Sequence, residues 1–348
     1  MSGRGVLCFS RPPRVAAAGC VGGRKEAEGP LAEGFDALVE DTRCGQPSWE
    51  LAESALARRA LDIALEKARL APENLDAALG GDLQNQCTAL AYAMRGVNAP
   101  FVGLYNACAT MAQGLGLAAA LVSGGFLHRA AALASSHFCA AERQFRTPLG
   151  YGGKRTPTAQ WTVTGAGAVV LAPGGPGLPA DGAPVHIAGA AFGRVVDAGV
   201  TDITNMGAAM APAAWDTIAR YLAATGRTPA GLDAIFTGDL GLVGSRLLVR
   251  LAQLDGAALE NHRDCGLLIY DRTRQAVGAG GSGAGCSACA LCAHILPGLA
   301  AGRWRRVLLV STGALMSQLT AQQGQSIPAV AHLVELAAGT SGQEGGSQ

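Results

Sequence analysis

The chain has 348 residues, of which 49% are hydrophobic and 15% charged, and its formal net charge is +1. This length suffices for two domains or one large α/β body, and the hydrophobic content excludes a disordered chain. The near-zero charge argues against a nucleic-acid-binding protein, which needs a basic face. No apolar stretch approaches the roughly 20 uninterrupted residues of a membrane-spanning helix. We therefore expect a soluble protein on the cytoplasmic side of the cell.

Helical and strand patterns alternate along most of the chain, which is typical of βαβ units with buried, mostly parallel strands. In chain order we expect a helix over Ser48–Arg69, a buried strand over Phe101–Tyr105, a helix over Thr110–Val122, strands over Ala131–Ser135, Ala168–Ala172 and Val185–Ala191, a helix over Pro212–Thr225, a strand over Ala234–Thr237, a helix over Gly244–Leu254, a strand over Gly266–Tyr270, a helix over Cys286–Ala301 and a strand over Val307–Ser311.

Two sequence echoes indicate an internal duplication. The nine residues Leu75–Leu83 (LDAALGGDL) match Leu232–Leu240 (LDAIFTGDL) at six positions, and Gly125–Arg129 before AALAS is echoed by Gly302–Arg306 before VLLVS. Because the echoes are collinear, a duplicated βα half explains them better than chance. We predict a first half over residues 1–172 carrying Cys108, a Pro/Gly-rich connector over 173–184, a second half over 185–338 and a mobile tail over 339–348.

Cys108 lies at the junction between the expected strand over Phe101–Tyr105 and the expected helix over Thr110–Val122. At a helix start, free backbone N–H groups and the helix dipole favour a thiolate. The pattern leaves two alternatives open, a nucleophile or a residue that lines a pocket.

The chain has 10 cysteines, and its length and composition favour reduced thiols over a disulfide framework. Three of them form the pattern CxxCxxC at Cys286, Cys289 and Cys292. A metal site is one interpretation of this pattern. The apolar, helical surroundings favour buried small residues instead, and we expect no metal and no cofactor.

Several long motifs resemble the stage V sporulation protein AD (SpoVAD) family, a branch of the thiolase-like fold. These are CGQPSWELAE (Cys44–Glu53), SSHFCAAERQFRTPLGYGGKRTPTAQWTVTGAGAVV (Ser135–Val170), GVTDITNMGAAMAPAAWDTI (Gly199–Ile218), TGDLGLVGS (Thr237–Ser245), DCGLLIYD (Asp264–Asp271), AGGSGAGCSA (Ala279–Ala288), STGALMS (Ser311–Ser317) and GQSIPAVAH (Gly324–His332).

The resemblance implies an α/β fold with two duplicated halves in a layered α-β-α-β-α body. It also implies a protein that binds dipicolinic acid (pyridine-2,6-dicarboxylate), with or without calcium, and aids its uptake into the forming spore. The implied partners are the SpoVA membrane proteins and a second copy of the chain. The implied location is the cytoplasmic side of the bacterial cell or of the forming spore, either in solution or peripheral to the inner spore membrane.

Condensing enzymes of the thiolase-like fold combine a nucleophilic cysteine with histidine, asparagine or a second cysteine. Cys108 fills the first role. The stretches Thr237–Ser245, Gly281–Ser287 and Ser311–Leu315 correspond to the other catalytic loops and contain no histidine. Serine and threonine hydroxyls do not titrate near neutral pH and cannot replace it as a base. We therefore favour a non-catalytic binding protein, and an acyltransferase that uses Cys108 remains the alternative.

A planar dianion needs paired donors for two carboxylates and a flat apolar wall. His137, which follows the expected strand over Ala131–Ser135, is either a donor that faces Cys108 or a core histidine. Arg143 and Arg146 either bind the ligand or pair with carboxylates, and Gln160 adds a neutral donor. The candidate ligand-binding residues are thus Cys108, His137, Arg143, Arg146 and Gln160. The other histidines are expected to be structural or at the surface: His128, His186, His262, His294 and His332.

Overall fold

The computed structural model describes residues 3–145, 155–174 and 183–339. Most of the predicted connector, all of the predicted tail beyond Gly339 and the candidate Arg146 lie outside these ranges.

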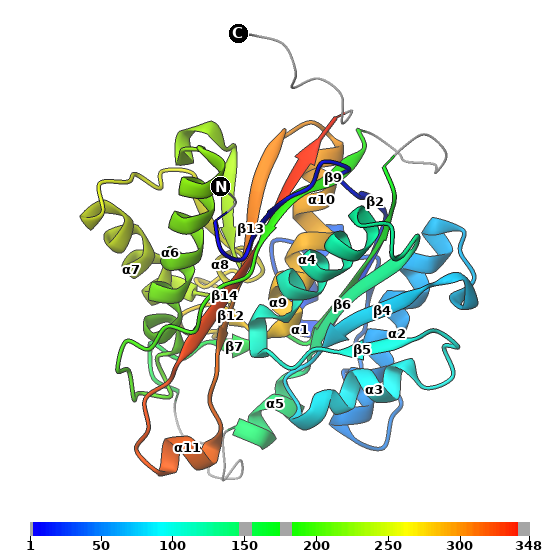
Figure 1. Ribbon diagram of the computed structural model, residues 1–348. Helices are drawn as coiled ribbons and strands as arrows, with labels where there is room; N and C mark the ends of the chain where they lie inside the picture. Colours follow the sequence, from blue (N-terminus) through cyan, green and yellow to red (C-terminus); the bar gives the residue numbers. More distant parts are fainter. Residues whose placement is uncertain (1–2, 146–154, 175–182, 340–348) are drawn as a thin grey trace, which may run out of the picture.

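One large sheet contains two similar sets of five strands (Figure 1). The first set runs β2 (Arg14–Gly22), β8 (Gly165–Ala172), β6 (Ala130–Ser136), β4 (Ala77–Gly81), β5 (Phe101–Gly103). The second runs β9 (Val185–Ala191), β14 (Ala329–Ala338), β13 (Arg306–Ala314), β10 (Ala234–Thr237), β11 (His262–Asp264). In each set the first two pairings are antiparallel and the last two parallel. The predicted duplication is therefore present in the strand order.

The two sets meet between β2 and β9 through the pair Arg14 and His186. Two short strands flank this junction: β1 (Val6–Cys8) is antiparallel to β9, and β3 (Ala37–Leu38) is parallel to β2. A separate parallel ladder joins β7 (Trp161–Thr162) to β12 (Gly281–Ser282), and so links the two halves a second time.

Helices form three layers around the strands. Helix α4 (Thr110–Ser123) contacts β4 and β6 on one side and β13 and β14 on the other, and its neighbour α9 (Ala284–Ala290) contacts β6 and β8. Helix α9 continues through a π-helical segment, Leu291–Ile295, into α10 (Leu296–Ala300). A helix between the two sets of strands is buried on several faces, which explains why α4 is built largely of Ala, Gly and Leu.

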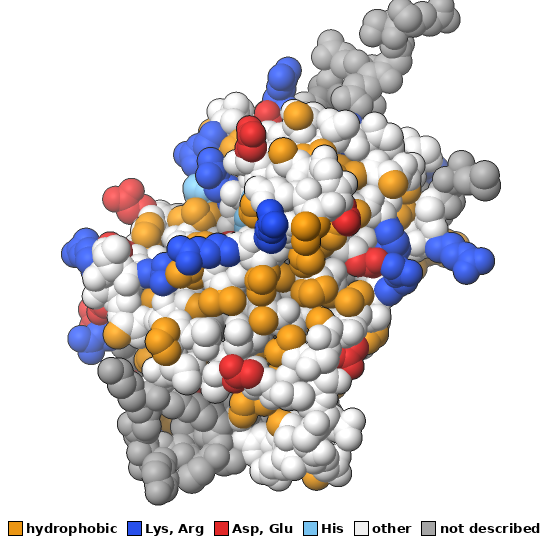
Figure 2. Space-filling model, turned by 90° about the vertical axis from the view of Figure 1, so that its left-hand side faces the viewer, with side chains coloured by type: hydrophobic (Ala, Val, Ile, Leu, Met, Phe, Trp, Pro, Cys, Tyr) orange, Lys and Arg blue, Asp and Glu red, His pale blue; other side chains and the backbone are white. Residues whose placement is uncertain are grey.

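The outer layers consist of α2 (Trp49–Ala68) with α3 (Thr88–Met94), and of α6 (Met206–Thr225) with α7 (Gly241–Leu254). Short helices complete the fold: α1 (Arg24–Ala27), α5 (Phe138–Phe145), α8 (Cys265–Leu268) and α11 (Gln318–Gln322). On the side of the molecule where Figure 1 places α7, hydrophobic side chains lie beside Lys and Arg side chains (Figure 2). Leu247 and Leu254 of α7 are exposed there, close in sequence to the exposed Arg246 and Arg250. The three helix layers and the two sets of strands between them form a five-layered α-β-α-β-α body, which is the predicted fold class.

The echoed aspartates make the same hydrogen bonds in both halves. The Asp76 carboxylate accepts from the backbone N–H groups of His128 and Arg129 at 2.6 and 2.8 Å. The Asp233 carboxylate accepts from those of Arg305 and Arg306, both at 2.8 Å. One sequence echo is thus bonded to the other in each half, which explains why they occur together.

One predicted element was wrong, and a second was wrong in part. The expected strand over Gly266–Tyr270 is the helix α8, because a short apolar run fits a buried helix as well as a strand. The expected buried strand over Phe101–Tyr105 is β5, at the edge of the sheet, where the side chain of Val102 is exposed. Within the described ranges, no helix combines the length and the apolar character that crossing a membrane requires.

Candidate functional site

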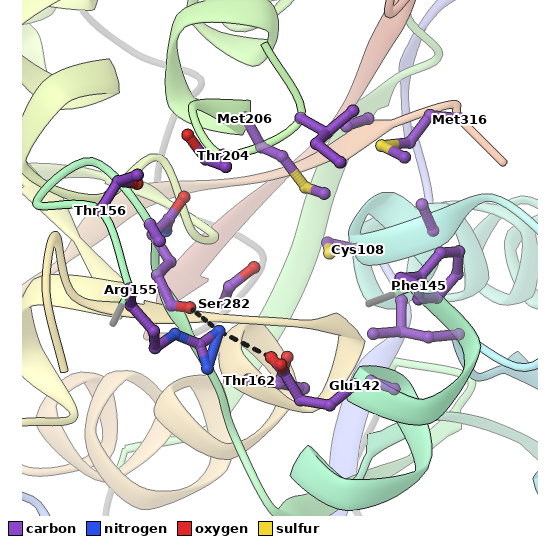
Figure 3. A pocket seen from close by; sticks show the side chains of 17 residues that line it. Cys108, Glu142, Phe145, Arg155, Thr156, Thr162, Thr204, Met206, Ser282 and Met316 are labelled. Atoms are coloured by element: carbon purple, nitrogen blue, oxygen red, sulfur yellow. Dashed lines mark hydrogen bonds and ion pairs between the residues drawn. The ribbon is translucent and has the colours of Figure 1, made fainter. Parts of the chain in front are cut away.

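A cavity of about 310 Å³ opens between the two halves and reaches Cys108. Its walls come from the Cys108 turn, α5, the segment before β7, the loop before α6, β12 and the end of β13. Figure 3 shows polar side chains such as Arg155, Thr156 and Ser282 on one side of Cys108, and the apolar Phe145 and Met316 on the other. The cavity thus offers hydrogen-bonding groups facing an apolar wall.

The turn that carries Cys108 is held in an unusual backbone conformation. Ala107 has a φ of +49°, a left-handed value that is uncommon for a residue with a Cβ atom. Cys108 follows in a single 3₁₀ turn, Ala107–Ala109, directly before α4. Gly313 of β13 lets this turn approach closely, since a Cβ atom there would lie 2.8 Å from the Asn106 carbonyl oxygen. The strain marks a turn that the surrounding structure holds in place.

The Cys108 thiol faces the carboxyl group of Asp239. Burial, followed by the charge and hydrogen bonding of Asp239, raises the pKa of the Cys108 thiol well above its usual value. Burial also raises the pKa of Asp239, although the backbone N–H of Gly283 and the hydroxyl of Thr312 donate to its carboxylate at 3.0 and 2.8 Å. Burial and the neighbouring carboxyl group outweigh the effect of the helix dipole on the thiol pKa. The helix start alone favours a thiolate, and the structure instead favours a neutral thiol.

None of the six histidines is among the residues that line the cavity. His332 comes from β14 and is close to the Cys108 turn, with Nε2 2.6 Å from the side-chain amide of Asn106. Its Nδ1 accepts from the backbone N–H of Gly193 at 3.1 Å, and burial lowers its pKa to about 4. His332 is therefore neutral near pH 7 and is directed at Asn106.

The structure brings two of the predicted ligand-binding residues, Cys108 and Gln160, to the cavity wall. The Gln160 side-chain amide donates to the carbonyl oxygens of Asp239 and Gly281, both at 2.7 Å, and so ties the segment before β7 to the second half.

His137 and Arg143 are directed away from the cavity. His137 Nε2 bonds the carbonyl oxygen of Thr42 at 2.9 Å, and its ring packs on Trp49 with centroids 5.3 Å apart. Arg143 lies on the exposed side of α5, where its guanidinium pairs with Glu50. These placements match the alternatives of a core histidine and a surface ion pair.

The sequence analysis missed Arg155 and Glu142 as site residues. Both line the cavity, and Arg155 Nη2 lies 2.6 Å from Glu142 Oε1. The available signal was the position of Arg155 shortly before Gln160 and Thr162. The hydroxyl groups of Thr162 and Ser282, on paired residues of β7 and β12, belong to the same wall.

The three cysteines of the CxxCxxC pattern point into separate parts of the core. The thiols of Cys286, Cys289 and Cys292 lie 3.3, 3.9 and 3.8 Å from the carbonyl oxygens of Gly238, Val21 and Ala168. Each thus has its own backbone acceptor, as expected of buried small residues.

Comparison with known proteins identifies the family. A family model described as "Stage V sporulation protein AD (SpoVAD)" matches residues 3–337. The Stage V sporulation protein AD of Bacillus subtilis (strain 168) is 43% identical over 333 residues, which cover 95% of this chain and 96% of the relative.

Solved structures of condensing enzymes share the fold at low sequence identity. The 3-oxoacyl-[acyl-carrier-protein] synthase III from Aquifex aeolicus VF5 has a TM-score of 0.54 at 14% identity, covering 93% of this chain and 99% of that chain. A variant of OleA from Xanthomonas campestris has a TM-score of 0.57 at 14% identity, covering 95% and 99%. The chain therefore has the thiolase-like fold and belongs to the stage V sporulation protein AD family.

Proposed function

We propose that this protein is a non-catalytic binding protein that captures dipicolinic acid in the Cys108 cavity and aids its uptake into the forming spore. The observation that carries the proposal is the pairing of the Cys108 thiol with the Asp239 carboxyl group, beside a cavity whose described lining residues include no histidine. Family membership supports the sporulation context.

The Cys108–Asp239 pair is poorly suited to nucleophilic catalysis. A thiolate needs a nearby base that carries its proton away or a cation that stabilises it. Asp239 supplies no cation, and while its carboxylate is ionised it opposes a second negative charge on sulfur. Burial is the first cause that raises the pKa of both groups, and the charge of Asp239 raises the pKa of the Cys108 thiol further. A neutral thiol, however, can pack against a ring without repelling a dianion.

The cavity suits a small ligand with one ring. Its volume of about 310 Å³ is at the lower end of the about 300–1,000 Å³ that is common for small-molecule sites. Phe145, Met206 and Met316 supply apolar contacts for a planar face, and the hydroxyl groups on the opposite side supply donors for carboxylate oxygens.

Calorimetric titration with pyridine-2,6-dicarboxylate, with and without calcium, tests the proposal. We expect wild-type protein to release or absorb heat and Cys108→Trp, which fills the cavity, to do neither. Cys8→Ser, which changes an exposed thiol on β1, should bind like wild type. An absence of heat with wild-type protein contradicts the proposal. An acyl-Cys108 adduct that forms from acyl-coenzyme A and turns over would instead support the alternative, an acyltransferase.

We also propose that two copies associate through the edge strand β5 and that the protein acts with SpoVA membrane proteins. The exposed side chains of Val102 and Tyr105 on or beside β5 support the first part, and only the family resemblance supports the second. Sedimentation equilibrium should show a dimer for wild type and a monomer for Val102→Lys. A wild-type monomer would refute the association.

A further inference from the structure

We propose that a carboxylate of the ligand binds by taking the place of Glu142 on the Arg155 guanidinium. Glu142 is then a built-in competitor that decides which anions the cavity holds. The inference rests on the proposed function in one respect only, namely that a planar carboxylate enters this cavity.

Arg155 and Glu142 are the charged pair of the cavity wall. Among the described residues that line the cavity, Arg155 is the one Lys or Arg and Glu142 the one Asp or Glu. Arg155 Nη2 donates to Glu142 Oε1 at 2.6 Å and to the carbonyl oxygen of Gln160 at 3.0 Å. Dashed lines mark interactions of the Arg155 guanidinium in Figure 3, among them the one with Glu142. The two side chains are 24% and 8% exposed. The guanidinium is thus partly accessible, while the carboxylate that it holds is buried.

Two aromatic rings fix the guanidinium in position. Arg155 Cζ lies 5.3 Å from the ring centroids of both Phe138 and Trp161, and these rings stack with centroids 3.8 Å apart at 10°. Phe138 and Glu142 are four residues apart in α5 and therefore lie on the same face of this helix. One helix face thus presents both the ring and the anion to Arg155, so the cation is oriented before any ligand arrives.

Exchange of carboxylates explains how such a site selects its ligand. An entering carboxylate forms the same charge-assisted bonds that Glu142 forms, so the exchange alone yields little free energy. The exchange also breaks the ion pair between Arg155 and the buried Glu142 carboxylate, and this loss is unfavourable for a buried charge. A small carboxylate therefore does not prevail. A planar aromatic acid gains apolar contacts with the opposite wall of Phe145 and Met316, and these favour the exchange.

Titration calorimetry on matched variants tests this competition. Glu142→Gln keeps an oxygen that accepts from Arg155 but removes the competing charge, so it should bind pyridine-2,6-dicarboxylate about tenfold more tightly. Arg155→Gln should weaken binding by about tenfold or more, and Arg155→Lys should lie between. In an Arg155→Gln background, Glu142→Gln should no longer tighten binding. Arg58→Gln, which removes the salt bridge to Asp62 on α2, is the control and should match wild type. Thermal unfolding of each variant verifies its folding.

The ligands separate this inference from the proposed function. Benzene-1,3-dicarboxylate has the same carboxylates without the ring nitrogen, and pyridine-2,6-dicarboxamide has the nitrogen without the charges. If only the benzene diacid binds, and binds more tightly to Glu142→Gln, the exchange holds and dipicolinate is the wrong ligand. If dipicolinate binds wild type and Glu142→Gln equally, or the diamide gains as much from Glu142→Gln, the exchange is refuted while the proposed function stands. If no aromatic carboxylate binds wild type or Glu142→Gln, both fail.

Discussion

The buried carboxyl pair Glu53 and Asp82 should make the stability of the folded protein fall as the pH rises. Glu53 lies in α2 and Asp82 directly follows β4, and each is at most 1% exposed. Burial, with the nearby charge of Asp82 as the second cause, raises the pKa of Glu53 from 4.5 to about 8. Burial raises the pKa of Asp82 from 3.8 to about 6. Gln84 Nε2 and the hydroxyl of Ser135 donate to Glu53 at 2.8 and 2.9 Å, and do not outweigh burial.

The sign of the effect follows from proton binding. An acid whose pKa is raised by folding holds more protons in the folded than in the unfolded chain, so the free energy of unfolding decreases with rising pH. The contribution of Glu53 is fully present below its unfolded pKa of 4.5 and is lost as the pH rises through its folded pKa of about 8. At about 1.4 kcal/mol for each pH unit, Glu53 alone lowers the free energy of unfolding by about 4 kcal/mol between pH 5 and pH 8.

Glu53→Gln removes this titration and keeps an amide that can bond Gln84 and Ser135. We expect the variant to match wild type near pH 5 and to be more stable than wild type by about 3–4 kcal/mol near pH 8. Urea denaturation followed by circular dichroism at several pH values measures both curves. Glu66→Gln, an exposed position on the same helix, should keep the wild-type slope. If Glu53→Gln also kept that slope, the pKa shift of Glu53 would not be the cause.

Two further predictions concern the Cys108 turn and the duplicated halves. Asp239→Asn should make Cys108 react severalfold faster with iodoacetamide at pH 8, because the variant lacks the carboxylate charge that adds to burial in raising the thiol pKa. Peptide mass spectrometry measures the rate of alkylation. An unchanged rate would show that burial alone protects the thiol. Asp76→Ala and Asp233→Ala should each lower the free energy of unfolding by about 1–3 kcal/mol, because each removes two hydrogen bonds to backbone N–H groups. Thermal unfolding measures both variants. If only one of them lost stability, the two aspartates would not be structurally equivalent.

Much of the fold could be predicted because its signals are local or repeated. Asp76 and Asp233 repeat in sequence since each bonds the backbone at the start of a neighbouring strand, so the duplication left a pattern that is visible without coordinates. The strand β5 and the helix α8 were harder. Their apolar residues fit several structures, and only the neighbouring chain decides whether such a run lies at a sheet edge or forms a buried helix.

The site was less predictable because it depends on contacts between distant residues. Cys108 and Gln160 could be selected from their positions beside a helix and a strand. The pairing of Arg155 with Glu142 could not, since it arises only when α5 folds against the segment before β7. The same holds for the thiol pKa: the helix start alone favours a thiolate, whereas binding of a dianion predicts a thiol whose pKa is not strongly lowered or is offset by nearby cations. The helix start is visible in the sequence, whereas Asp239 comes from the other half of the chain.

Asp82 and Asp239 occupy equivalent positions in the two sequence echoes but make different contacts, and this difference explains why a carboxyl group lies beside Cys108. Asp82 accepts from the backbone N–H of Leu90 at 2.8 Å and so holds the first turn of α3. In the second half a different residue, Asp264, takes that task, accepting from the N–H groups of Leu240 and Gly241 at 2.8 and 3.0 Å at the start of α7. Asp239 therefore does not have to hold its own helix and can turn toward Cys108. Since an ionised Asp239 opposes a negative charge on sulfur, this change in one half of a duplicated fold supports the proposed binding function over the alternative of an acyltransferase.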